Sequence, residues 1–405
     1  MDPTPLKPLR WGIVSLLLAA TLVNYIDRQT VSVLAPTLQR ELTFSTRQYA
    51  VITSLFLITY ALTMWLWGTV FDRIGNRKGM TGALGWWSLA EAAHALALGP
   101  VSLGAARAAL GAGESGNWPG VTRTIAAWFA EKERALAMGI VNCGAALGSA
   151  IAAPLIVYAY LAVGWRATFV ATALLGLGWV LAWLRVYPRG SERVLVGAEP
   201  VPLGPLVRDR RVWGIILGRF FGDPIWWLYL NWLPLYLSHE RHFSQTDIGR
   251  YAWMPFAAAA LGCLLGGGTS GWLINRGWSV NAARKTAIVI GTVFMPAGLF
   301  VFGAETTAGA IAAMCCTLFG FQFWVGNVQT LPSDLFPVGA VGAIAGISGS
   351  AAGLGSVFLT LSTGWVVERF SYNPILITAG ILGPVATVVL FCLIGRIPRR
   401  GKAAG

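Results

Sequence analysis

Long apolar runs are the feature that most constrains what this chain can fold into. A helix of about 20 apolar residues crosses the roughly 30 Å hydrocarbon core of a bilayer, because each helical residue adds about 1.5 Å. Hydropathy places twelve such spans along the chain, at residues 11–36, 48–71, 79–98, 101–122, 136–161, 166–187, 212–237, 249–274, 284–303, 306–331, 341–366 and 374–395. With 56% hydrophobic and only 12% charged residues, the chain is predicted to be an all-α membrane protein.

The distribution of basic residues indicates how the chain is oriented in the membrane. The formal charge of +13 would suit nucleic acid binding only if the basic residues clustered on one solvated surface, and they do not. Most of the 30 Lys and Arg fall on the side of the predicted N-terminus, and only Arg28, Arg107 and Arg219 lie deep within spans, away from the span ends. By the positive-inside rule, we expect both termini to be cytoplasmic.

A charged turn follows the second span and has a weaker copy half a chain later. The first copy, residues 68–78, has the form GxxxDRxGxRK. The second copy begins at Gly271 and carries Asn275 where the first copy has Asp72. This repeat predicts two six-helix halves, residues 1–190 and 212–405, joined by a polar cytoplasmic linker at residues 191–211.

The first charged turn resembles the signature of the major facilitator superfamily. Three segments of the first half resemble its anion:cation symporter family: Asn24 to Arg28, Arg107 to Pro119 and Trp128 to Arg134. Three segments of the second half most resemble the bacterial hexuronate branch of that family: Asp223 to Trp227, Trp232 to Pro234 and Leu331 to Pro337. The resemblance covers nearly the whole chain. It implies a twelve-helix major facilitator fold and an organic anion substrate, and we expect a monomer in the bacterial inner membrane.

The first span holds an acid and a guanidinium near its middle. Asp27 lies about 24 Å along the helix from Trp11 and about 13 Å short of Pro36, well inside the hydrocarbon layer. An unpaired charge at that depth costs about 2.5 to 3.5 kcal/mol, so Asp27 and Arg28 are predicted to face the bundle interior. Because adjacent helical residues point about 100° apart, we expect one to face a protein partner and the other a cavity. A permanent ion pair that only locks helices together remains an alternative.

The fourth span carries a second polar face. Arg107 and Glu114 are two helical turns apart and lie on nearly one face, which Asn117 continues. A carboxyl in a dry cavity is suited to bind and release a proton, so Glu114 is a predicted proton-coupling residue. Asp27 is a second one if Arg107 leaves it during the cycle. The alternative is that Arg107 and Glu114 only neutralise each other along their helix.

An anionic substrate favours a guanidinium, because its fork holds a carboxylate through two parallel hydrogen bonds. Arg28 is the predicted residue for this role, and the resemblance implies the same role, with Asp27 and Glu114 in proton coupling. Tyr25 lies one turn before Arg28, and Tyr60 is a second hydroxyl within a span. Both are predicted substrate-binding residues, with a packing role as the alternative.

The second half offers further substrate contacts. Trp324 and Asn327, three residues apart in the tenth span, pair an apolar face for a sugar ring with an amide for its hydroxyls. An amide within a span is costly unless it has partners. Arg219 and Asp223, four residues apart, are predicted to pair with each other as a structural element.

Four charged residues at the cytoplasmic turns are predicted to form a gate rather than a ligand site. They are Asp72, Arg73 and Arg77 in the first charged turn and Arg134 before the fifth span. We expect them to tie the halves together in one access state.

Two histidine-containing pairs complete the set of candidates. Glu91 and His94 lie one turn apart in the third span and are a candidate proton relay, although that span is usually peripheral in the superfamily. His239 and His242 lie three apart in an outer loop but have no third ligand at a suitable spacing, so we predict no metal site.

These features predict a proton-coupled symporter that imports an organic acid anion, a hexuronate sugar acid, by alternating access. No HExxH or GxSxG motif is present, so the chain is not expected to be an enzyme. No cofactor is expected, since the proton gradient is the driving force. The open alternatives are sodium coupling, anion exchange, an aldonate, aldarate or monocarboxylate as substrate, and a non-transporting anion sensor.

Overall fold

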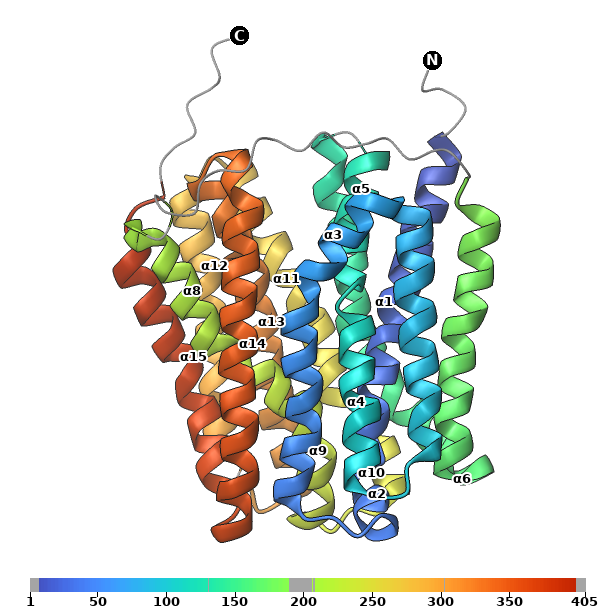
Figure 1. Ribbon diagram of the computed structural model, residues 1–405. Helices are drawn as coiled ribbons and strands as arrows, with labels where there is room; N and C mark the ends of the chain where they lie inside the picture. The colour runs from blue at the N-terminus through green and yellow to red at the C-terminus, as the bar shows by residue number, and fades with distance from the viewer. Residues whose placement is uncertain (1–6, 130, 189–205, 207, 302, 398–405) are drawn as a thin grey trace. The chain divides into compact units, whose positions relative to one another are not determined.

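The computed structural model describes residues 7–129, 131–188, 206, 208–301 and 303–397, and these residues are overwhelmingly helical (Figure 1). The first helices are α1 (Lys7–Val33), α2 (Ala35–Glu41), α3 (Thr46–Ala93), α4 (Pro100–Glu114), α5 (Asn117–Trp128) and α6 (Glu131–Val186). The later ones are α8 (Arg210–Gly222), α9 (Pro224–His239), α10 (Gln245–Tyr251), α11 (Met254–Asn275), α12 (Val280–Phe294), α13 (Thr307–Leu335), α14 (Val338–Arg369) and α15 (Asn373–Ile394). Short 3₁₀ turns at His94–Leu96 and Met295–Phe300 extend α3 and α12.

These helices contain the twelve predicted spans. Eight helices of the described chain are individually long and apolar enough to cross a membrane. Two of these, α3 with its 3₁₀ extension and α6, hold two predicted spans each. The fourth span is divided between α4 and α5, and the seventh between α8 and α9. The predicted all-α membrane fold is therefore confirmed.

Glycine allows the chain to reverse inside both long helical segments. Gly75 has a φ of 79° and Gly164 a φ of 78°, in the left-handed region that side chains disfavour. Gly75 belongs to the predicted charged turn, which lies at the same end of its bundle as the start of α1 (Figure 1). Each reversal places two spans side by side as an antiparallel pair.

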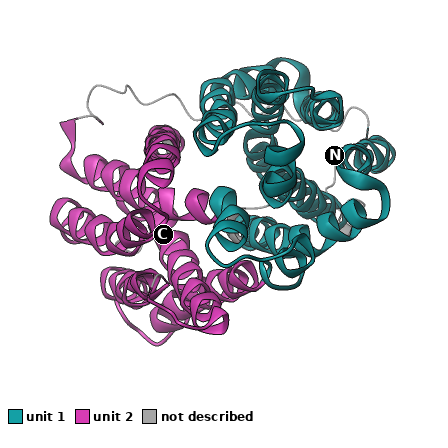
Figure 2. Ribbon diagram, turned by 90° about the horizontal axis from the view of Figure 1, so that it is seen from below, with its two compact units in different colours: residues 1–195, 230–253 teal, residues 196–229, 254–405 magenta. Residues whose placement is uncertain are grey.

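The chain divides into two compact units (Figure 2). Unit 1 comprises Met1–Leu195 and Leu230–Trp253, and unit 2 comprises Val196–Tyr229 and Met254–Gly405. Most of the predicted linker, residues 191–205 and 207, lies outside the described residues. The outer part of α9 thus belongs with the first six spans by its contacts, although it follows the linker in sequence.

Pro234 explains part of the attachment of α9 to unit 1. A proline has no amide hydrogen, so the carbonyl of Leu230, four residues earlier, loses its helical donor. The hydroxyl of Ser32 in α1 lies 2.8 Å from that carbonyl oxygen. The hydroxyl of Tyr49 in α3 donates to the neighbouring carbonyl of Asn231 at 2.6 Å. Side chains of α1 and α3 therefore satisfy backbone groups of α9.

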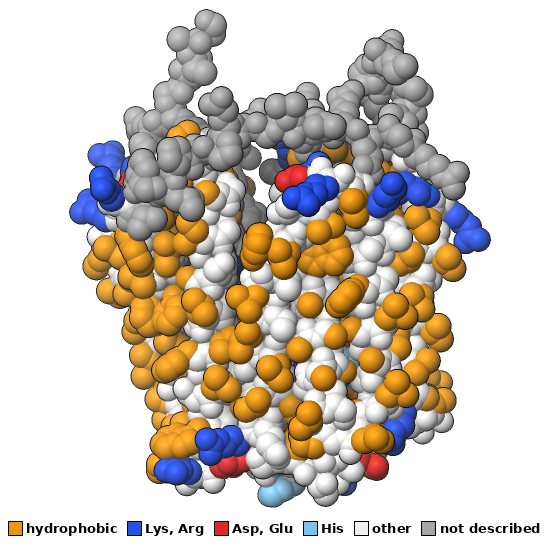
Figure 3. All heavy atoms as spheres, viewed as in Figure 1, with side chains coloured by type: hydrophobic (Ala, Val, Ile, Leu, Met, Phe, Trp, Pro, Cys, Tyr) orange, Lys and Arg blue, Asp and Glu red, His pale blue; other side chains and the backbone are white. Residues whose placement is uncertain are grey.

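The surface matches a chain surrounded by lipid. Figure 3 shows hydrophobic side chains over the flanks of the helices, with Lys and Arg gathered near the helix ends. Large apolar side chains such as Leu62, Trp65 and Leu98 are exposed. Such extensive apolar exposure would be unfavourable in water, and it is expected where acyl chains are the solvent.

Candidate functional site

The charged centre of α1 is fully buried in unit 1. Asp27 is 0% exposed and Arg28 only 1% exposed. Both therefore face the protein interior, as the apolar surroundings in the sequence predicted. Burial of two charges is favourable only when other groups compensate them, so their partners define the site.

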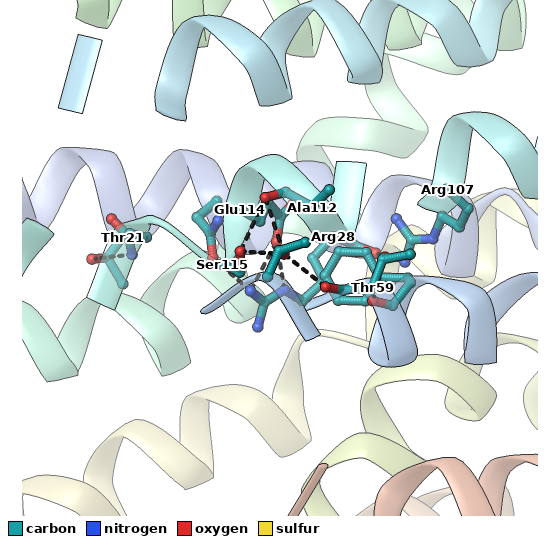
Figure 4. Close-up of polar contacts among 11 residues, drawn as sticks. Thr21, Arg28, Thr59, Arg107, Ala112, Glu114 and Ser115 are labelled. Atoms are coloured by element: carbon teal, nitrogen blue, oxygen red, sulfur yellow. Dashed lines mark hydrogen bonds and ion pairs between the residues drawn. The ribbon is translucent and has the colours of Figure 1, made fainter. Parts of the chain in front are cut away.

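Arg28 forms an ion pair with Glu114, the last residue of α4. Its Nε donates to Glu114 Oε2 at 2.9 Å, and Nη2 lies 2.8 Å from the same oxygen (Figure 4). Nη2 also donates to Asn24 Oδ1, one turn earlier in α1, at 2.9 Å. Both members of the ion pair are excluded from solvent. The guanidinium thus connects two helices that are distant in the sequence.

Aromatic rings surround the Arg28 guanidinium. Its carbon lies 4.6 Å from the ring centre of Tyr25, 5.1 Å from that of Tyr60 and 5.2 Å from that of Phe56. The negative face of an aromatic ring attracts a cation, and the attraction strengthens where water is excluded. Tyr25 and Tyr60, both predicted to bind substrate, therefore lie beside the predicted carboxylate-binding arginine.

A break between α4 and α5 positions Glu114. The amide of Gly116 donates to the carbonyl of Gly113. In a continuous α-helix it would donate to the carbonyl of Ala112 instead. The freed carbonyl of Ala112 accepts from the Trp67 indole at 2.8 Å and from the Ser115 hydroxyl at 3.0 Å. Because these side chains satisfy the freed carbonyl, the helix can end at Glu114 inside the bundle.

Arg107 lies in the same buried region but has different contacts. Its Nη2 donates to the backbone carbonyl of Arg28 at 2.8 Å, and its guanidinium lies 4.8 Å from the Phe56 ring centre. Among described residues, the ion pair of Glu114 is with Arg28 and not with Arg107. The alternative that Arg107 and Glu114 neutralise each other along one helix is therefore wrong in this structure.

Asp27 faces a mixed group of charges. Neither of its carboxylate oxygens is in hydrogen-bonding geometry with a described donor, and the Trp87 indole lies beside it. The Asp27 carboxylate interacts electrostatically with three charged groups, those of Glu91, Glu114 and Arg107. Asp27 is thus close to Arg107, as expected, without a direct hydrogen bond to it.

Glu91 also lies in this buried region, although the sequence paired it only with His94. The carboxyl is 0% exposed, and its Oε1 accepts from the Thr172 hydroxyl of α6 at 3.1 Å. Arg107 and Glu114 are the charged groups that act on it. His94 Nδ1 lies 3.7 Å from the other Glu91 oxygen. The third span is therefore not peripheral at this position.

Asn117 is buried at the start of α5. Its amide nitrogen lies 3.3 Å from the Thr21 hydroxyl of α1, which in turn donates to the Leu17 carbonyl. Its Oδ1 has no hydrogen-bond partner among the described residues. The side chain thus has an acceptor available for a ligand hydroxyl.

In unit 2, Trp324 and Asn327 are both buried and make different contacts. The Trp324 indole donates to the Thr387 hydroxyl at 2.8 Å. The Asn327 amide donates to the Gly266 and Phe323 carbonyls at 3.1 and 3.0 Å. An amide within a span requires such partners, and here the backbone supplies them.

The Asn327 side chain also belongs to a charged network. Arg284 of α12 donates to Asn327 Oδ1 at 3.4 Å and to the Ser270 hydroxyl at 2.9 Å. The same guanidinium forms an ion pair with Asp334 at 2.9 Å. The second charged turn has Asn275 where the first has the acid Asp72. Asp334 thus supplies the acid that balances Arg284 in this second copy.

Arg219 and Asp223 form the predicted ion pair, at 2.7 Å. Arg219 also donates to the Ser348 hydroxyl of α14 at 3.3 Å. A few residues farther along α14, Gly355 lies against the Phe220 carbonyl, where a Cβ would be too close. Close packing of α14 on α8 therefore uses the glycine-rich sequence of α14.

Three of the four predicted gate residues have separate partners within unit 1. Asp72 is paired with Arg123, a partner that the sequence analysis did not identify. Arg73 is exposed, and Arg77 donates to the Leu184 and Tyr187 carbonyls at 2.6 and 3.1 Å. Arg134 donates to the Ala126 and Phe129 carbonyls at 3.0 Å each. Arg77 and Arg134 therefore bind helix C-termini, where cations are favourable.

Among described residues, no group of His, Cys, Asp or Glu is arranged to hold a metal ion.

A bundle of membrane-crossing helices with a buried network of charges is typical of a membrane transporter, because charge inside a bilayer is costly and is retained where it has a function. The family model described as Major Facilitator Superfamily matches residues 17–360. The chain belongs to this superfamily, and it is a transporter rather than an enzyme.

Curated relatives that match most of the chain support this class. The chain is 31% identical over 415 residues to the hexuronate transporter of Escherichia coli (strain K12), covering 97% of this chain and 96% of the relative. It is 32% identical over 334 residues to the galacturonate transporter of Dickeya chrysanthemi, covering 77% and 95%.

A solved structure supports the fold alone. A bacterial homologue of the human lysosomal transporter Spinster, in an inward-facing and occupied conformation, superposes with a TM-score of 0.77 at 18% identity. The superposition covers 98% of this chain and 99% of that one. The predicted superfamily and its twelve-helix fold are therefore confirmed.

Proposed function

We propose that this protein is a proton-coupled symporter of hexuronate sugar acids. The observation that carries the proposal is the buried ion pair between Arg28 and Glu114, with the further acid Asp27 nearby. The similarity to curated transporters of hexuronate and galacturonate supports this substrate class.

Arg28 is the proposed ligand of the substrate carboxylate. Its guanidinium is held by a carboxylate already, so a substrate carboxylate can take the place of Glu114 with the same geometry and charge. Tyr25, Tyr60 and Asn117 are proposed to bind sugar hydroxyls, since the tyrosines adjoin Arg28 and Asn117 has an unused acceptor. In unit 2, Trp324 and Asn327 remain proposed sugar contacts.

Glu114 is the proposed acceptor of the coupled proton. When the substrate takes its place on Arg28, Glu114 becomes a buried carboxylate that has lost its ion-pair partner, which is strongly unfavourable. A proton on its oxygen removes that charge. One monovalent anion therefore enters with one proton, and the buried charge stays constant. Asp27, with Arg107 beside it, is the proposed second coupling acid.

The orientation and the gate complete the proposal. The positive-inside rule places both termini in the cytoplasm, across a bacterial inner membrane. Asp72, Arg73, Arg77 and Arg134 are proposed to stabilise one access state through contacts near the cytoplasmic helix ends. The ion pair of Asp72 with Arg123 supports a structural role for the turn.

A counterflow screen tests the substrate. Purified protein in liposomes loaded with unlabelled galacturonate should concentrate external labelled galacturonate transiently. Galactonate, glucarate and lactate, each loaded in the same way, serve as comparison anions. Counterflow of lactate without counterflow of galacturonate would contradict the proposed substrate class.

A further inference from the structure

Asp27 and Glu91 bring two carboxyl groups to one guanidinium. Asp27 lies in α1 and Glu91 in the second half of α3, and both are 0% exposed. Glu91 is the first of the charged groups that act on Asp27. Arg107, from α4, acts on both carboxyls, and so does Glu114. Elements α1, α3 and α4 thus supply every charged group in this region, while α6 supplies the uncharged Thr172.

The hydrogen bonds in this region leave polar atoms without partners. Both oxygens of Asp27, Oε2 of Glu91, and Nε and Nη1 of Arg107 are buried and have no hydrogen-bond partner among the described residues. Arg107 instead donates through Nη2 to the Arg28 carbonyl. Buried polar atoms are almost always satisfied in folded proteins, so these atoms leave hydrogen-bonding capacity for a proton or a ligand.

His94 does not supply a positive charge to this region. Its Nδ1 lies 2.9 Å from the Ala90 carbonyl and 3.2 Å from the Glu91 carbonyl. Carbonyl oxygens only accept, so Nδ1 carries a proton and donates it to the backbone. Its Nε2 has no described partner that would stabilise a second proton. The ring is therefore a neutral neighbour, and a relay through Nδ1 is blocked.

Counting charges fixes the number of protons. Arg28 and Glu114 neutralise each other in their ion pair. Arg107 then supplies one positive charge against two carboxyls, Asp27 and Glu91. If both were ionised, the buried region would carry a net negative charge, which is costly at low dielectric. Two buried carboxyls that interact electrostatically in such an environment favour holding one proton between them, because the second ionisation is opposed by the first.

We propose that Asp27 and Glu91 share one proton beside Arg107, and that this pair delivers the proton to Glu114 when substrate displaces Glu114 from Arg28. In that step an O–H bond of the pair breaks and an O–H bond of Glu114 forms. The pair then takes a new proton from solution. Glu91 is thereby a third coupling residue. The delivery step rests on the proposed function, whereas the shared proton does not.

Infrared spectroscopy tests the shared proton without transport. The full-length protein in lipid vesicles at neutral pH should show the C=O stretch of a protonated carboxyl. Glu91→Gln and Asp27→Asn should each lose the same part of that band, because the remaining acid then ionises against Arg107. Glu91→Gln retains an acceptor for the Thr172 hydroxyl and should fold. Glu240→Gln, an exposed acid outside this region, is the matched control and should keep the full band.

An unchanged carboxyl band in Glu91→Gln would overturn the proposal, because the proton would then reside elsewhere. Loss of the band in only one of the two variants would also overturn it, because that result assigns the proton to a single residue. This measurement tests whether Asp27 and Glu91 share a proton, and it does so even if the protein does not carry hexuronates.

The pH profile of uptake tests delivery. In Glu91→Gln no proton is stored, so the initial rate of galacturonate uptake should fall about tenfold for each unit rise in external pH. The parent should respond less steeply near neutral pH, and Glu91→Asp should restore the parental profile. A parental profile in Glu91→Gln would overturn the delivery role. No uptake by the parent would instead refute the proposed function.

Discussion

Replacing Arg28 by lysine tests the proposed carboxylate site most sharply. Lysine keeps the positive charge but loses the planar fork, because an ammonium is a single compact donor group. In the structure Arg28 uses Nε and Nη2 toward Glu114 and Nη2 toward Asn24. A single ammonium can replace only part of this arrangement.

The size of the effect follows from those contacts. A hydrogen bond between charged groups contributes about 1.5 to 3 kcal/mol, and Arg28→Lys should cost one such bond to the substrate carboxylate. Since 1.4 kcal/mol corresponds to tenfold in Kd, galacturonate binding should weaken about 10- to 100-fold.

Isothermal titration calorimetry on the purified protein measures this change. Arg219→Lys is the matched control, because Arg219 is also paired with an acid within a span but is assigned a structural role. Its Kd should stay within about threefold of the parent, a change below 1 kcal/mol. Equal affinities in Arg28→Lys and the parent would refute the assignment of Arg28 to the substrate carboxylate.

Three further predictions concern Glu114, Asp72 and Asp209. Glu114→Gln should still exchange labelled for unlabelled galacturonate but should not accumulate it against a gradient when the outside is acidic; full accumulation in liposomes would exclude Glu114 as the coupling acid. Asp72→Asn should bind galacturonate normally and change the accessibility of single-cysteine probes at the two membrane faces, since its ion pair with Arg123 is lost; unchanged accessibility would contradict a gating role. Hydrogen bonds from Arg211 hold the pKa of Asp209 below its usual range, so Asp209 stabilises the start of α8. This stabilisation is present above the ordinary Asp pKa of about 3.9 and is lost as the pH falls through the lower folded value. Hydrogen-exchange protection at the start of α8 should decrease in that acidic range. Protection that does not change with pH would refute the stabilising role of Asp209.

The fold was largely predictable because the bilayer restricts the choices. A run of apolar residues long enough to cross the membrane has to be helical, since backbone groups in lipid must bond within the segment. Hydropathy therefore located the spans. It did not reveal the breaks after Glu114 and Gly222, which depend on local alternatives to the helical hydrogen bond.

The pairing within the candidate site was less predictable. Helical periodicity relates residues on one helix, so it connected Arg107 with Glu114. It cannot identify partners on different helices, and Arg28 and Glu114 are 86 residues apart. The partner of Asp72, Arg123, was missed for the same reason. The burial of Glu91 depends on the packing of α3 against α6, which a single sequence does not specify.

The central claim is that one proton accompanies each anion. The direct measurement records internal pH and galacturonate entry together in sodium-free liposomes that contain the purified protein. The account predicts internal acidification that begins with galacturonate entry and amounts to one proton for each anion. Galacturonate entry without acidification, or entry that requires sodium, would contradict it.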